Sequence, residues 1–98
     1  MSCFVYIISN ANRTLYAGIT FDLIRRVEQH KKGIHPNGFT SRYNFDRLVF
    51  FEEALNRTSA ARREKQIKGW THAKKVTLIE KTNPDWKDLS VTWRDVLT

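Results

Sequence analysis

Residues 3–19, with the sequence CFVYIISNANRTLYAGI, decide the fold of this chain. Two runs rich in apolar, β-branched and aromatic residues, Cys3 to Ser9 and Thr14 to Ile19, flank the polar, turn-prone segment Asn10-Ala11-Asn12-Arg13. Two such runs joined by a short polar loop predict a β-hairpin.

The hairpin brings two tyrosines together. If its loop is centred near Ala11, Tyr6 lies opposite Tyr16, and both side chains share one face of the sheet. Such a pair can act in chemistry, or it can simply stabilise the hairpin. Gly18, near the end of the second strand, would allow another group to approach the backbone closely.

One further strand and three helices are expected downstream, from cap residues, Gly and Pro positions and apolar periodicity. They are a helix after Asp22 reaching Lys32, a strand over Leu48–Phe51 covered on both faces, a helix over Ser59–Lys68 and a helix after Thr71 reaching Lys81. The order ββαβαα predicts an α+β domain over residues 1–89, in which helices flank a small three-stranded antiparallel sheet. Residues 90–98 are left as an unassigned C-terminal tail, and the whole stretch from Asp85 to Thr98 has no clear period.

Composition limits the class of protein. Ninety-eight residues suit one domain. Seventeen Lys and Arg against ten Asp and Glu give a formal charge of +7, which favours a polyanionic partner such as DNA, RNA or anionic lipid. No apolar stretch is long enough for a membrane span, and the only cysteine, Cys3, rules out a disulfide within the chain. A cytoplasmic protein is expected.

The first helix places an arginine beside the core. The inward stripe is formed by Leu23 and Val27, with Ile24 beside it. Arg26 and His30, four positions apart, stack along the edge of this stripe, whereas Arg25 points to solvent. Arg26 could therefore serve a site on the sheet surface, or its stem could merely cover the core edge. His30 could act in the same site or be a hydrogen-bonded structural histidine.

A carboxylate interrupts the apolar face of the second helix. Glu64 lies between Ala60 and Ile67 on the face expected to be buried. A desolvated carboxylate needs a cation, a metal or several donors. Either Glu64 forms a structural pair with Arg63 or Arg26, or it binds a metal ion.

Taken in order, these motifs resemble the GIY-YIG nuclease superfamily. Phe4-Val5-Tyr6 and Tyr16-Ala17-Gly18 resemble its paired signatures, with Phe4, Val5 and Ala17 departing at backbone or packing positions. Residues 22–30 resemble its first helix and align Arg26 with the family arginine. Residues 62–68 resemble its metal-glutamate helix and align Glu64 with the ligand. Residues 4–89, including the segment NPDWKDL at 83–89, resemble short stand-alone bacterial members.

The resemblance implies hydrolysis of a DNA phosphodiester by water, with a role in DNA repair. Glu64 would hold one Mg²⁺ or Mn²⁺ ion, and Arg26 would stabilise charge on the phosphoryl oxygens. Tyr16 would be the general base, with Tyr6 orienting the water or sharing that role. His30 would position or relay a proton. His35 and His72 have no partner at a zinc-ligand spacing.

Several cations could follow the DNA backbone. These are Lys31, Lys32, His35 and Arg42 after the first helix, and Arg62, Lys65 and Lys68 on the second, with Lys74 and Lys75 as an extension. No dedicated base-reading element is evident, so selectivity for DNA structure, or a protein partner that supplies specificity, is expected.

Two alternatives remain open at this stage. A non-catalytic nucleic-acid-binding module on the same fold would explain the charge, but it gives no reason for Glu64. A protein-interaction domain would use Trp86 and Trp93 as an apolar patch.

Overall fold

The computed structural model describes residues 2–33 and 44–91. Within these ranges the chain forms three strands and three helices in the expected order ββαβαα. The strands are β1 (Cys3–Ser9), β2 (Leu15–Thr20) and β3 (Arg47–Ala54), and the helices are α1 (Leu23–Lys31), α3 (Arg57–Lys68) and α4 (His72–Thr82). The strands form one antiparallel sheet in the order β2-β1-β3.

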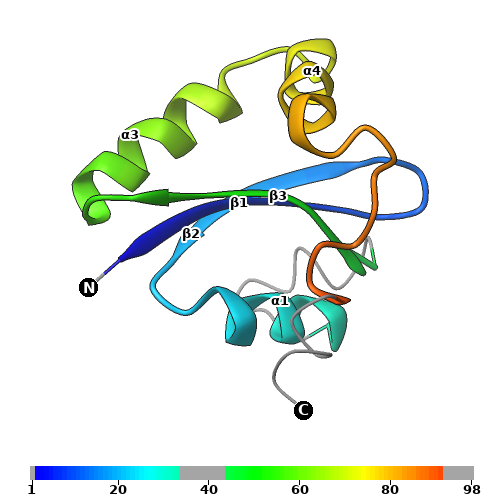
Figure 1. Cartoon of the computed structure of the whole chain (residues 1–98), viewed down its shortest axis with the longest axis horizontal. Helices are drawn as coiled ribbons and strands as arrows, with labels where there is room; N and C mark the ends of the chain where they lie inside the picture. Colours follow the sequence, from blue (N-terminus) through cyan, green and yellow to red (C-terminus); the bar gives the residue numbers. More distant parts are fainter. Residues whose placement is uncertain (1, 34–43, 92–98) are drawn as a thin grey trace.

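Helices cover both faces of this sheet. In Figure 1, α3 and α4 lie above the sheet and α1 lies below it. Alternate residues of β1 therefore enter two separate cores. Val5 and Ile7 pack towards α3 and α4, whereas Tyr6 and Ile8 pack towards α1. This is the central strand, and almost all of its side chains are buried.

Each helix begins at a polar residue that accepts a backbone hydrogen bond, as the sequence predicts for the first and the last of them. Asp22 accepts from the amide of Arg25 at the start of α1. Asn56 and Thr71 play the same part for α3 and α4. Gly33 follows α1 with φ 74°, a left-handed conformation that glycine adopts at low cost.

Two expectations about the strands are wrong. The hairpin register places Tyr6 opposite Gly18 and Tyr16 opposite Ile8, because the turn is centred one residue later than Ala11. This shift moves the pairing by two residues, so both tyrosines still share one face. The third strand is longer than expected and lies at the sheet edge, where its second half, including Phe51, is not fully covered.

The segment after α4, which the sequence left without a structure, packs firmly. In Figure 1 it passes from the α4 side of the sheet to the α1 side. Asn83 is buried and donates to the carbonyls of Val49 and Lys87. Trp86 is 6% exposed and donates to Glu80. The burial of Trp86 removes it from any exposed apolar patch, and Trp93 lies outside the described residues.

Asp88 joins this segment to β3 and to α1. Its carboxylate accepts from the amide of Leu48 and from Ser90, and forms an ion pair with Lys31. Ser90, assigned to the tail by sequence, is itself buried. In the part of the chain described here, no helix has the length and apolar character needed to cross a membrane.

Candidate active site at the free edge of β2

The site begins with a glycine that lets a tyrosine cross the hairpin. Tyr6 lies on the central strand, and its phenol extends over Gly18 on the neighbouring edge strand. A Cβ atom at Gly18 would stand 2.6 Å from the Tyr6 hydroxyl oxygen and 2.7 Å from its Cζ. Only glycine leaves room for this crossing, so the close approach expected at Gly18 is confirmed.

His30 fixes the position of that phenol. The Tyr6 hydroxyl and His30 Nε2 are joined by a buried hydrogen bond of 2.9 Å, and each residue is 1% exposed. The His30 ring also lies against Tyr16, with ring centroids 5.5 Å apart. His30 thus contacts both tyrosines from α1.

The electrostatic surroundings of Tyr6 include two further predicted site residues. Burial and then the neighbouring Tyr16 raise the pKa of Tyr6 well above its ordinary value. Arg26 offsets part of this through its charge and hydrogen bonding, and the negative charge of Glu64 raises the pKa further. Arg26 and Glu64 are therefore both close enough to act on one phenol, although they come from helices on opposite faces of the sheet.

Tyr16 is the more accessible of the two tyrosines. Its side chain is half-buried, and its ring packs against Phe45 at a centroid distance of 6.1 Å. Lys68 Nζ reaches across from α3 to lie 5.7 Å from the centre of the Tyr16 ring. Tyr16 therefore marks the place where side chains from α1 and α3 meet.

Glu64 is less buried than its sequence position suggested. It lies about 50° around α3 from the centre of the packed face between Ala60 and Ile67, and its side chain is 23% exposed. Its ion-pair partner is Lys68, at 3.5 Å, and not Arg63 or Arg26.

Arg63, the other partner considered for Glu64, is engaged on a different strand. It forms an ion pair of 2.6 Å with Glu52 and donates to Gln66.

The predicted site residues thus come from both faces of the sheet. The tyrosines and Arg26 belong to the α1 face, whereas α3, which carries Glu64, packs on the opposite face. They approach one another because β2 is an edge strand, so long side chains from α3 can pass around it. Arg25 is exposed, as expected, while Arg26 is half-buried; both line one shallow hollow beside Thr20.

The cations predicted to follow DNA are dispersed. Lys31 forms an ion pair with Asp88 and is only 17% exposed, so it is not part of a DNA-binding surface. Lys32 is exposed at the end of α1. Arg62 and Lys65 are exposed but lie about 150° around α3 from its packed face. His35 and Arg42 lie outside the described residues. Of the three α3 cations, only Lys68 reaches Tyr16.

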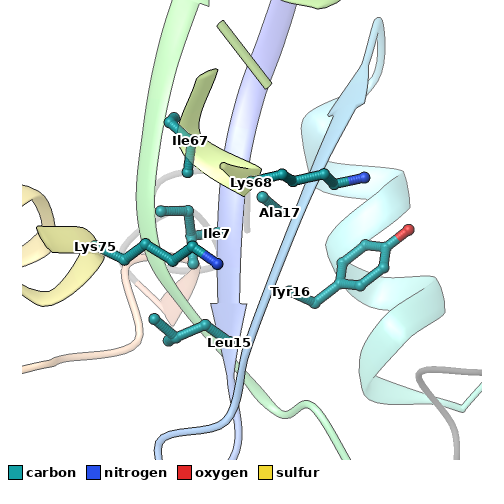
Figure 2. A pocket seen from close by; sticks show the side chains of 7 residues that line it. All are labelled: Ile7, Leu15, Tyr16, Ala17, Ile67, Lys68 and Lys75. Carbon is teal, nitrogen blue, oxygen red and sulfur yellow. The ribbon is translucent and has the colours of Figure 1, made fainter. Parts of the chain in front are cut away.

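A second hollow opens on the other side of Tyr16. Figure 2 shows Lys68 from α3 and Lys75 from α4 extending over it from two sides, with Tyr16 beside β2. Its volume is about 170 Å³, and its lining residues are Ile7, Leu15, Tyr16, Ala17, Ile67, Lys68 and Lys75. From the sequence, Lys75 was named together with Lys74 as an extension of the DNA-backbone cations, and the packing of α4 on the sheet brings only Lys75 to this hollow.

The donor set suits a metal that needs few protein ligands. Among the described residues, no three His, Cys, Asp or Glu side chains cluster as a metal cage. Glu64 offers one partly exposed carboxylate, and its one ion pair within residues 2–33 and 44–91, at 3.5 Å, is longer than a normal charged hydrogen bond. Mg²⁺ is commonly held by one or two carboxylates together with water and substrate phosphates. The residues therefore fit such an ion and do not fit a closed structural zinc site.

The chain is similar to several known proteins. The model of the GIY-YIG catalytic domain matches residues 2–77. A UPF0213 protein of Desulfotalea psychrophila is 35% identical over 77 residues, which cover 79% of this chain and 70% of that protein. A UPF0213 protein of Syntrophus aciditrophicus is 33% identical, with 84% and 93% covered. The solution structure of a UPF0213 protein from Bacillus halodurans is similar with a TM-score of 0.55 and 25% identity, over 90% of this chain and 93% of that one.

Proposed function

Because the chain belongs to the GIY-YIG family, whose domain implies a nuclease-type function, we propose that it is a metal-dependent endonuclease that hydrolyses DNA phosphodiester bonds. The proposal is supported by one arrangement: Lys68 links Tyr16 to Glu64, and both Arg26 and Glu64 act electrostatically on the neighbouring Tyr6. A module that only binds DNA would have no need of a carboxylate among these residues.

Tyr16 is the better candidate for the general base. A base must be reachable by the attacking water, and Tyr16 is half-buried whereas Tyr6 is 1% exposed. The raised pKa of Tyr6 keeps its hydroxyl protonated. The buried Tyr6–His30 pair, joined at 2.9 Å, would instead position Tyr16, whose ring His30 contacts.

Arg26 and Glu64 supply the complementary charges. The half-buried guanidinium of Arg26 lies near the Tyr6 hydroxyl, where its planar donors suit two phosphoryl oxygens. Glu64 would hold one Mg²⁺ or Mn²⁺ ion. When bound, that ion would stabilise negative charge on the phosphate and on the leaving oxygen. The described residues contain no dedicated base-reading element, so we expect selectivity for DNA structure. The proposed setting of the activity is DNA repair in the cytoplasm.

The test is plasmid nicking by Glu64→Gln, with Glu53→Gln as the matched control. Both changes remove one negative charge, but Glu53 lies exposed on β3, the far edge strand. We expect Glu64→Gln to lower the metal-dependent nicking rate by at least ~10²-fold and to keep DNA affinity. Stability should change by less than about 0.5 kcal/mol, because the Glu64–Lys68 pair is a long, partly exposed i,i+4 pair. A folded variant that nicks at the wild-type rate, or wild-type protein that binds DNA without metal-dependent cutting, would contradict the proposal.

A further inference from the structure

The hollow between Lys68 and Lys75 combines cations with an apolar floor. Its floor consists of Leu15, Ala17 and Ile67 with Ile7 beneath. The Lys75 ammonium lies over this floor, and Lys68 crosses it so that its ammonium lies towards Tyr16 (Figure 2). A lysine can lay its alkyl stem on such a floor while its charge faces outward. This arrangement suits a ligand with one apolar side and one anionic side.

Lys75 lines the hollow without an ion-pair partner among the described residues. Its side chain is half-buried at the hollow, and it has no carboxylate within 4.0 Å in residues 2–33 and 44–91. Lys68 is only loosely paired, at 3.5 Å from Glu64. Lys74, the neighbour of Lys75, instead lies 4.6 Å from the centre of the Trp70 ring. Two adjacent lysines of α4 therefore have different surroundings, and only one of them reaches the site.

The position of the hollow relates it to the proposed chemistry. Tyr16 lines it directly, and the Arg25–Arg26 hollow lies at the other end of β2, beside Thr20. The five steps from Leu15 to Thr20 span about 17 Å of strand. Cationic side chains thus flank the two tyrosines at both ends of one sheet edge, which is the arrangement that a single nucleic-acid strand running along β2 would need.

We propose that this hollow is a phosphate-binding subsite that holds a backbone phosphate of the DNA strand to one side of the bond that is cut. Lys68 and Lys75 bind the phosphate, and the apolar floor receives the C–H face of the adjoining deoxyribose. The subsite deepens the proposed function and rests on it for the identity of the substrate. Phosphate contacts carry no base information, so this contact positions the strand without reading its sequence.

The experiment compares Lys75→Ala with Lys74→Ala. Both variants remove one positive charge from neighbouring positions of α4, so they change the net charge of the protein equally. Affinity for a fluorescent DNA duplex is measured by anisotropy at several salt concentrations in the presence of a chelator, and melting temperatures confirm that both variants fold. Because no metal and no cleavage are involved, the result is independent of whether Glu64→Gln abolishes nicking.

We expect Lys75→Ala to weaken binding about fivefold and to lower the slope of log affinity against log salt by about one. Lys74→Ala should change affinity by less than about twofold, and Lys75→Arg should restore binding. Equal losses in the two alanine variants would show that only net charge matters, and unchanged binding by Lys75→Ala would show that no phosphate lies there. Either result overturns the subsite.

Discussion

Replacing Gly18 with alanine should damage the protein through one identifiable clash. The new Cβ would lie 2.6 Å from the Tyr6 hydroxyl oxygen and 2.7 Å from Cζ. These are atoms of a rigid, fully buried ring that is also bonded to His30. The ring cannot turn aside without losing that hydrogen bond or displacing its packing partners.

The magnitude follows from two contributions. Overpacking of a well-packed core costs about 1–3 kcal/mol, and loss of the Tyr6–His30 hydrogen bond costs about 1 kcal/mol. Gly18→Ala should therefore lower the free energy of unfolding by about 2–4 kcal/mol. For a domain of this size the melting temperature should fall by roughly 10–25 °C.

Gly69 provides the matched control. A Cβ there would meet only backbone oxygens at 3.6 Å, an ordinary contact, and its φ of −79° suits any residue. Gly69→Ala should be neutral or stabilise by about 0.4–1 kcal/mol, because alanine restricts the unfolded chain.

Urea and thermal denaturation measure both glycine variants, and a double-mutant cycle with Tyr6→Phe tests the cause. Removing the hydroxyl should relieve the closest contact, so the double variant should lose less stability than the sum of the single changes. If Gly18→Ala is as stable as Gly69→Ala, or if the two changes are strictly additive, the proposed crossing of Tyr6 over Gly18 is wrong.

Two further predictions concern catalysis and acid stability. Tyr16→Phe should lower metal-dependent nicking by about 10²–10⁴-fold, the usual contribution of a general base, with little change in melting temperature; a plasmid assay giving wild-type rates would assign the base elsewhere. Burial alone would raise the pKa of Asp88, but hydrogen bonds from Lys31, Ser90 and the Leu48 amide outweigh it and hold that pKa below its ordinary value. Stability from Asp88 is thus fully present above the unfolded pKa of about 4 and is lost as pH falls through the lower folded value. Unfolding curves should show a shallower decline below about pH 4 for Asp88→Asn than for wild type, and identical declines would refute this linkage.

The sequence alone predicted those features that depend on a partner only a few residues away in the chain. Helix starts at Asp22 and Thr71 depend on a side chain and an amide three positions apart, so cap residues predicted them well. The two-residue alternation of the hairpin placed Tyr6 and Tyr16 on one face even though the register was shifted.

The candidate site residues were identified because they lie at unusual positions and resemble the family motifs. Their surroundings in the fold were predicted less well. Glu64 was recognised as a charge on a packed helix, but its exposure and its pairing with Lys68 were not foreseen. The pairing of Lys31 with Asp88 joins residues 57 positions apart, so no local pattern could reveal that this lysine has a structural partner.

The sequence by itself determined the elements, their caps, the sheet faces of their side chains and the family. Those properties depend on backbone periodicity and on contacts within a few residues. Only the tertiary structure decided that β2 is an edge strand, past which Lys68 of α3 reaches Tyr16 while it stays paired with Glu64. It also brought Lys75 over the same edge. The order of the strands and the packing of the helices depend on how distant segments of the chain together bury two cores. The pattern of residues along the sequence does not show which distant side chains become neighbours.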